Sequence, residues 1–322
     1  MIKHLLSIVI PVMNEEQNIA PLIKAISKSL ANLDYEIVFV DDGSLDGTVE
    51  EIKKLSQDNI RLVEFSRNFG QTSAMAAGIE YAEGEYIVTM DGDLQNDPSD
   101  IPMMLKKLQK DNLDILAGIR ANRSDGFILR KIPSITANWL IRKISRVNIT
   151  DIGCTLKVFK SSLAKKLDLF GELHRFIPVL ASIYGAKIDE VPVKHHPRKH
   201  GVSKYGIGRT IRVLSDLSTM LFLIKYRQKP MHLFGTLGFG IFGIGSLIGF
   251  YLLIMKLLGH DIGHRPLFFI CILMIITSIQ LITTGFIAEL LMRTYFSTGK
   301  NKPYSIAKIY VGGKEVKVPK HL

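Results

Sequence analysis

Residues 85–98 read EYIVTMDGDLQNDP, an apolar run that ends in two aspartates around a glycine. The run is typical of a buried strand, so Asp91 and Asp93 stand where that strand ends. A carboxylate at the edge of a core is costly unless a cation meets it. Two carboxylates at a tight turn suit Mg²⁺ or Mn²⁺, which prefer oxygen ligands. The stretch therefore predicts a divalent metal site, although an aspartate pair by itself is also compatible with a simple turn.

Four further apolar runs precede and follow this stretch, and helical patterns separate them. The runs cover residues 5–12, 35–42, 60–66 and 114–120, and residues 19–30 and 100–110 have the helical pattern. Near-continuous apolar strands that alternate with helices indicate a mostly parallel sheet covered on both faces. We therefore predict an α/β domain over residues 1–205.

Polar residues, most of them acidic, follow three of the predicted strands. They are Asn14 with Glu15, Asp41 with Asp42, and Asp91 with Asp93. In open parallel sheets, ligands bind beyond the carboxyl ends of the strands. The pattern predicts a site along one sheet edge for a metal and for a ligand rich in hydrogen-bonding groups, such as a nucleotide.

Two short motif matches point elsewhere and fail in their context. The stretch 42–47 begins like a calcium-binding EF-hand loop, but a strand precedes it and the twelfth position is Lys53 instead of glutamate. The glycines of 238–243 spell the dinucleotide fingerprint GxGxxG, but no strand precedes them. Close helix packing in a membrane explains these glycines better. A NAD-dependent oxidoreductase thereby loses its main support.

Two long segments contain no Asp, Glu, Lys or Arg, namely residues 230–255 and 266–288. About 20 apolar residues are needed to cross the hydrocarbon core of a bilayer. We therefore predict a membrane protein with this order of parts: the α/β domain, amphipathic interface helices at 206–230, a two-helix transmembrane hairpin at 231–293, and a cytoplasmic tail at 294–322.

Basic residues flank the predicted hairpin on its outer sides. Those before it are Arg209, Arg212, Lys225, Arg227 and Lys229, and those after it are Arg293, Lys300, Lys302 and Lys308. The link between the segments carries only Lys256 and Arg265. The positive-inside rule therefore predicts that both termini and the α/β domain are cytoplasmic. Membrane orientation and anionic lipid account for much of the net charge of +11, so a nucleic-acid partner is not needed.

Taken together, the motifs resemble a known family. They are Pro11…Asn14-Glu15, Val40-Asp41-Asp42-Gly43-Ser44-x-Asp46-Gly47, Asp91-Gly92-Asp93-Leu94-Gln95 and Arg198…Gly201-x-Ser203-Lys204. The first three resemble the signature of inverting family-2 glycosyltransferases with the GT-A fold. With the fourth and the two apolar segments, the chain is similar to polyisoprenyl-phosphate glycosyltransferases, a group that includes dolichyl-phosphate mannose synthases. The two-span layout resembles above all the GtrB-type bactoprenol glucosyltransferases.

The resemblance implies a role for each matching residue. The residues expected to line the base and ribose of the nucleotide are Pro11, Met13, Glu15, Val40 and Asp42, with Gly92 in backbone contact. The expected ligands of Mg²⁺ or Mn²⁺ are Asp91, Asp93 and Gln95. The residues expected to meet phosphates of the donor or acceptor are Arg120, Arg130, Ser134, Arg198 and Lys204, with Asp151 near the sugar or the acceptor. Of these, Asp91, Asp93 and Arg198 are expected to be catalytic.

The implied reaction transfers a hexose, glucose from UDP-glucose, to a polyprenyl phosphate such as undecaprenyl phosphate at a bacterial inner membrane. A single displacement at C1 would invert the anomeric configuration. Because the acceptor phosphate is already anionic, a strong general base is not obligatory. The alternatives are another donor such as GDP-mannose, or an inactive membrane-anchored scaffold. The glycine-rich first segment and the tail, where Gly312 and Gly313 are placed to turn a hairpin, permit a dimer or tetramer.

The basic run HHPRKH at residues 195–200 has three interpretations. A phosphate-gripping loop, in which Arg198 and Lys204 close over the active site, is favoured over a solvated charge run. A transition-metal site built from the histidines is disfavoured by Pro197 and by the basic neighbours. The QxxRW motif of processive synthases is not found around the single tryptophan, Trp139, which disfavours a polymerising enzyme.

Overall fold

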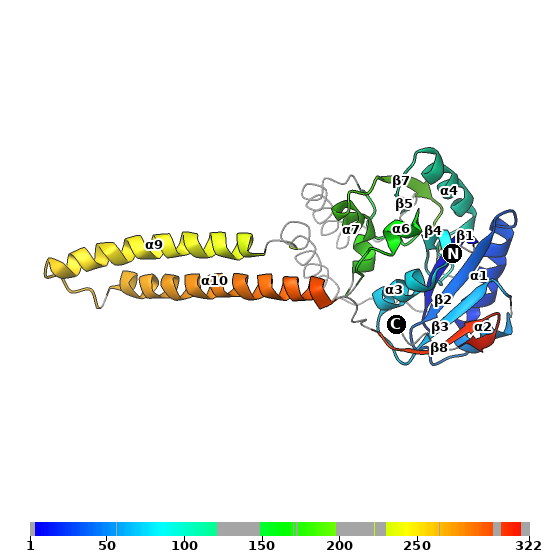
Figure 1. The fold of residues 1–322 in the computed structure, drawn as a ribbon, viewed down its shortest axis with the longest axis horizontal. Helices are drawn as coiled ribbons and strands as arrows, with labels where there is room; N and C mark the ends of the chain where they lie inside the picture. The colour runs from blue at the N-terminus through cyan, green and yellow to red at the C-terminus, as the bar shows by residue number, and fades with distance from the viewer. Residues whose placement is uncertain are drawn as a thin grey trace. The chain divides into compact units, whose positions relative to one another are not determined.

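The computed structural model describes residues 4–55, 57–120, 149–169, 171, 173–197, 222, 230–263, 265–298 and 304–316. The chain forms two units. Residues 1–220 and 302–322 make up the first, and residues 221–301 make up the second. The first unit is a sheet with helices, and the second is a pair of long helices (Figure 1).

A nine-stranded sheet forms the centre of the first unit, in the order β7-β5-β6-β4-β1-β2-β3-β8-β9. Its strands are β1 (His4–Val12), β2 (Tyr35–Asp41), β3 (Ile60–Phe65), β4 (Gly84–Thr89), β5 (Ile115–Arg120), β6 (Lys157–Lys160), β7 (Ile188–Val193), β8 (Ile306–Val311) and β9 (Lys314–Val316). Strands β1 to β4 are parallel to one another, as are β5 and β7, whereas β6, β8 and β9 run antiparallel to their neighbours. The predicted mostly parallel sheet is confirmed, with its five expected strands.

Helices cover both faces of the sheet because side chains alternate along each strand. The described helices of this unit are α1 (Glu16–Ser29), α2 (Thr48–Lys54), α3 (Gln71–Tyr81), η1 (Pro98–Asp100), α4 (Ile101–Lys110), α6 (Ser161–Ala164), η2 (Leu173–Phe176) and α7 (Ile177–Ile183). Leu6, Ile8 and Ile10 of β1 share one core cluster with α1, α2 and α4. On the other face, α3 approaches so closely that a Cβ on Gly78 would lie 2.3 Å from Val9 Cγ1.

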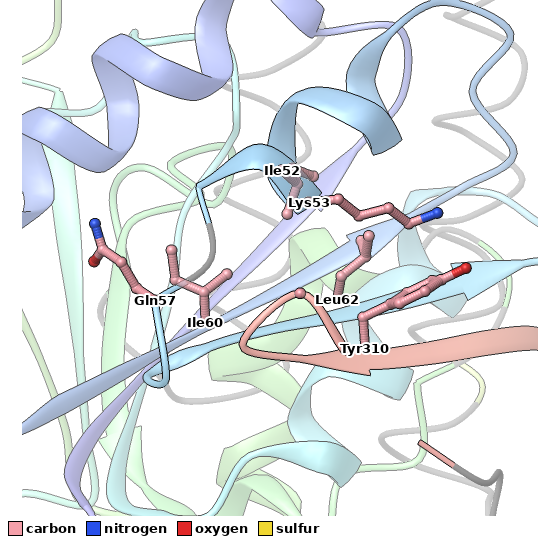
Figure 2. Close-up of a pocket in the computed structure, with 7 residues that line it drawn as sticks. Ile52, Lys53, Gln57, Ile60, Leu62 and Tyr310 are labelled. Carbon is pink, nitrogen blue, oxygen red and sulfur yellow. The ribbon is translucent and has the colours of Figure 1, made fainter. Parts of the chain in front are cut away.

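The C-terminal segment belongs to this same sheet. Strand β8 pairs antiparallel with β3, and β9 pairs with β8 through a turn at Gly312 and Gly313, both with positive φ. The expected hairpin is present, and its two strands, which lie within the predicted tail at 294–322, extend the sheet of the first unit. Figure 2 shows Tyr310 of β8 beside β3 and α2, with Lys53 Nζ 4.0 Å from the centre of its ring. Strands β8 and β9 thus extend the sheet beyond β3.

The second unit consists of α9 (Met231–Leu257) and α10 (Pro266–Thr298), which pack against each other. Both helices are long and apolar enough to cross a membrane, and most of the side chains described for them, at 231–257 and 266–291, are exposed. A Cβ on Gly238 would lie 2.7 Å from Ile282 Cγ1, so this glycine allows the two helices to approach closely. The predicted amphipathic helices at 206–230 lie almost entirely outside the described residues.

Candidate active site

Three neighbouring strands bring their polar ends to one edge of the sheet. The strands are β4, β1 and β2, which are adjacent in the sheet order and parallel. Asp91 and Asp93 follow β4, Asn14 follows β1, and Asp42 follows β2. The structure therefore brings together the strand ends from which the sequence predicted a single site.

Asp91 is held by protein donors on both carboxylate oxygens. Gln71 Nε2 donates to Oδ1 and Thr155 Oγ1 donates to Oδ2, each at 2.8 Å. Burial, followed by the charge of Asp93, raises the pKa of this carboxyl to about 6. The two hydrogen bonds fix the direction of the buried carboxylate.

Asp93 lies in a tight turn packed against β1. Leu94 has a φ of 62°, and Gln95 N donates to Asp93 Oδ1 at 3.2 Å. A Cβ on Gly92 would lie 2.9 Å from Val12 Cγ1, so a glycine is required for the turn to sit this close to the strand. Packing against β1 therefore requires a glycine at position 92, independently of the backbone contact with the nucleotide that is expected there.

The first residues of the basic run lie beside this turn. His196 N donates to Gln95 O at 2.8 Å, and His195 forms an isolated bridge with Asn96. His196 Nε2 is 3.0 Å from Asp97 Oδ2, and this contact helps to lower the pKa of Asp97 to about 2. The run therefore begins at the aspartate turn.

The oxygen atoms at this turn fit a divalent metal that arrives with its own ligands. Among the residues that the structure describes, no three His, Cys, Asp or Glu side chains form a cluster able to enclose an ion. The predicted ligands Asp91, Asp93 and Gln95 would supply only part of a coordination sphere. Mg²⁺ and Mn²⁺ commonly take their remaining ligands from water and substrate phosphates. A cation here would also offset the burial and the repulsion from Asp93 that together raise the pKa of Asp91.

The residues expected to line the nucleotide differ in their surroundings. Asp42 is buried, and its Oδ1 accepts a hydrogen bond from Phe69 N at 2.6 Å. Met13 is half-buried, as are Glu15 and Pro11. Val40 is fully buried in the core, so the structure does not support a contact between its side chain and a nucleotide.

Arg120 and Asp151 form a two-pronged ion pair. Arg120 Nε and Nη2 donate to the two carboxylate oxygens of Asp151, each at 2.8 Å. The backbone N of Asp151 donates to Glu190 Oε1 at 3.2 Å, which ties the pair to β7. The sequence predicted both residues for the site but not their pairing. Arg130, Ser134, Arg198 and Lys204 lie outside the described residues.

Several polar residues near the site were not predicted. Gln71 and Thr155 bind Asp91, and Lys157 is fully buried with its Nζ donating to the carbonyl of Cys154. Burial lowers the pKa of Lys157. His174 is buried, its Nδ1 is 2.6 Å from Thr72 Oγ1, and burial lowers its pKa to about 3, so it is neutral. None of these residues directly follows one of the five predicted strands.

Comparison with known proteins places these features in a family. The model of glycosyl transferase family 2 matches residues 7–168. A dodecaprenyl-phosphate galacturonate synthase of Rhizobium johnstonii is 45% identical, over 95% of this chain and 93% of its own. An undecaprenyl-phosphate 4-deoxy-4-formamido-L-arabinose transferase of Pseudomonas fluorescens is 33% identical, over 98% of this chain and 93% of its own. These matches run through both units.

A solved structure supports the fold independently. Glucosyl-3-phosphoglycerate synthase of Mycobacterium tuberculosis, crystallised with Mn²⁺, UDP and phosphoglyceric acid, has a TM-score of 0.54 and 17% identity over 68% of this chain and 79% of its own. At that identity the likeness shows the GT-A fold alone. The acidic strand ends, the family model and the relatives agree that this chain belongs to glycosyl transferase family 2 and is a glycosyltransferase of GT-A fold.

Proposed function

We propose that this enzyme transfers a sugar from a nucleotide diphosphate sugar to the phosphate of a polyprenyl phosphate, with inversion at C1. The observation that carries the proposal is the combination, in one chain, of the acidic GT-A strand ends with two helices long and apolar enough to span a membrane. A polyprenyl acceptor stays in the bilayer, so its glycosyltransferase needs contact with the membrane. The relatives named for dodecaprenyl and undecaprenyl phosphate support this acceptor.

The chemistry needs positioning and charge neutralisation more than proton transfer, because the acceptor phosphate is already an anionic nucleophile. Asp91, Asp93 and Gln95 would hold Mg²⁺ or Mn²⁺, which would stabilise the negative charge on the departing nucleoside diphosphate. Arginines suit the phosphates because their forked donors can bind two oxygens at once. For that role we propose Arg120 and Arg198, together with Arg130, Ser134 and Lys204, and we propose Asp151 near the sugar or the acceptor.

The donor sugar is the least constrained part of the proposal. The sequence resemblance favours glucose from UDP-glucose. The names of the relatives, galacturonate synthase and formamido-arabinose transferase, favour a uronic acid or an aminoarabinose derivative instead. We therefore propose a UDP-sugar as donor and rank galacturonate before glucose. The galacturonate relative is 45% identical to this chain, whereas the formamido-arabinose relative is 33% identical.

For the site of action we propose the cytoplasmic face of a bacterial inner membrane. Strand β8 follows both long helices in the sequence yet pairs with β3, which precedes them. Strands of one sheet lie on one side of a bilayer, so this pairing supports two crossings and termini on the same side. The flanking lysines and arginines support the cytoplasm as that side.

The test is transfer by the purified full-length protein in detergent. UDP-glucose, UDP-galacturonate, GDP-mannose and a UDP-aminoarabinose derivative are each incubated with undecaprenyl phosphate, with Mn²⁺ or with EDTA. We expect lipid-linked sugar from one donor, in the presence of the metal only, and with an inverted anomeric carbon in the product. Retention at C1 would refute the single displacement. Absence of transfer from every donor would favour an inactive membrane-anchored scaffold.

A further inference from the structure

The segment just before β8 contacts a loop beside the predicted nucleotide site. Residues 66–70 follow β3, and we call them the β3 loop. The ring of Tyr304 stacks on Phe65 at the start of this loop, with centroids 5.1 Å apart and planes 16° apart. Ser66 N donates to Ser305 O at 3.1 Å. The chain just before β8 is thus bound to the loop by a ring stack and a backbone hydrogen bond.

The β3 loop itself contacts residues at the strand ends of the site. Phe65 meets Phe69 edge to face at 5.6 Å. Phe69 N donates to Asp42 Oδ1 at 2.6 Å, and Asn68 Nδ2 lies 2.8 Å from Met13 Sδ. Asp42 and Met13 stand at the ends of β2 and β1, where the nucleotide is proposed to bind.

The loop also packs directly on the backbone below it. A Cβ on Gly43 would lie 2.7 Å from both Arg67 C and Asn68 N, so any displacement of the loop changes the space above Asp42. The side chains of residues 66–68 are exposed, and the β3–β8 pairing shifts register between Glu64 and Phe65. Such irregularities end regular pairing and re-aim the chain. Beyond this point, the stack of Tyr304 on Phe65 holds the two segments together in place of regular strand pairing.

The β8–β9 hairpin and a hydrogen bond to α3 fix the segment that carries Tyr304. Ile309, which pairs with β3, and Tyr310, which lies beside β3 and α2 in Figure 2, are both buried. The hydroxyl of Tyr304 donates to Glu80 Oε2 on α3 at 2.6 Å. Tyr304 is therefore fixed on two sides before it meets Phe65.

We propose that Tyr304 is a positioning residue for the nucleotide donor: by stacking on Phe65 it sets the β3 loop, and the loop sets Asp42 and Met13. This inference rests on the proposed function, since it assumes that the donor binds at these strand ends. It assigns the segment that follows the second long helix a part in binding the donor.

The experiment compares full-length Tyr304→Ala, Tyr304→Phe and wild-type protein in detergent. Calorimetry with UDP and Mn²⁺ gives the nucleotide Kd, and hydrogen exchange of residues 66–70 reports the loop. Tyr304→Ala should bind UDP about two- to tenfold more weakly, the worth of one aromatic pair, and exchange faster in the loop. Tyr304→Phe keeps the stack but loses the hydrogen bond to Glu80, so its Kd should lie closer to that of wild type than to that of Tyr304→Ala. The control Glu315→Gln, which alters an exposed ion pair with Lys308 on the same hairpin, should match wild type.

The outcomes separate the inference from the proposed function. If wild type binds UDP and Tyr304→Ala binds it equally well, the inference is wrong and the proposed function stands. If wild type binds neither UDP nor GDP with Mn²⁺, both are wrong. Should Tyr304→Ala fail to fold, Tyr304→Leu replaces it, because leucine keeps an apolar side chain without a ring. Wild-type affinity in Tyr304→Leu would equally overturn the inference.

Discussion

The carboxyl of Asp91 is fixed between Gln71 and Thr155 and lies close to the charge of Asp93. Its pKa of about 6 means that below this pH a divalent ion must displace a proton in order to bind. With UDP-glucose, whose diphosphate has no group that titrates near this pH, we expect the affinity for Mn²⁺ to be nearly constant above about pH 7 and to fall up to about tenfold per pH unit below about pH 6. Calorimetry of the full-length protein across this range measures the effect.

A variant at the same position identifies the titrating group. Asp91→Asn removes the proton that competes with the metal, so its binding should be weaker at neutral pH but should lack the inflection near pH 6. A wild-type affinity that stays flat down to about pH 5 would contradict this assignment of the proton to Asp91.

Arg120 offers a second test at the scale of one residue. Its guanidinium binds both oxygens of Asp151, a geometry that lysine cannot reproduce. Hydrogen bonds to charged groups contribute about 1.5–3 kcal/mol, so Arg120→Lys should lower transfer by roughly tenfold or more. The assay is initial rate at saturating acceptor.

An arginine away from the site serves as the matched control. Arg61 donates to Glu83 Oε1 and to Tyr81 O, each at 2.7 Å, at the opposite ends of the parallel strands. Arg61→Lys should lower thermal stability while the rate per folded molecule stays unchanged. A full wild-type rate in Arg120→Lys would show that the forked contact is not needed.

The residues at the strand ends could be predicted because each directly follows an apolar run that identifies a strand. Gln71, Thr155 and Lys157 could not be predicted in this way. Gln71 opens a helix and Lys157 opens a strand of four residues, and their contacts with the acidic edge depend on how distant segments pack. Hydrogen bonds such as Thr155 to Asp91, 64 residues apart, leave no local pattern in the sequence.

Helix α9 carries glycines that differ in their surroundings, and this difference predicts opposite outcomes. A Cβ on Gly238 would lie 2.7 Å from Ile282 Cγ1 of α10, whereas one on Gly240 would meet nothing within 4 Å. Overpacking costs about 1–3 kcal/mol, so Gly238→Leu should lower the melting temperature of the second unit in detergent. Gly240→Leu should leave it nearly unchanged. Equal melting temperatures for the two variants would contradict the close packing of α9 on α10.

The elements differ in how well the sequence predicted them. Strands β1 to β5 are largely buried and separated by helices, so their apolar runs are continuous. Strand β7 has only one buried residue, Val193, and β6 spans four residues, so neither has a clear pattern. The place of β8 in the sheet depends on pairing with β3 across more than 200 residues, and no local signal encodes such a partner.

The whole chain has to return to its starting sheet, which predicts its arrangement in a membrane. Since β8 and β3 are neighbours, tags placed at the N-terminus and at the C-terminus should be protected together from protease added to intact bacterial spheroplasts. A protease site inserted in the link at residues 258–265 should be cleaved under the same conditions. Cleavage of one terminal tag but not of the other would exclude two crossings.

The position of β8 also has a consequence for biosynthesis. A ribosome translates the α/β core first, then both long helices, and only afterwards the strand that completes the edge of the sheet. Until the helices have emerged, β3 has an unpaired edge, which is open to wrong partners. Completion of the sheet therefore has to wait for synthesis of both long helices, and a fragment cut before α9 would carry every predicted donor residue yet expose that edge permanently.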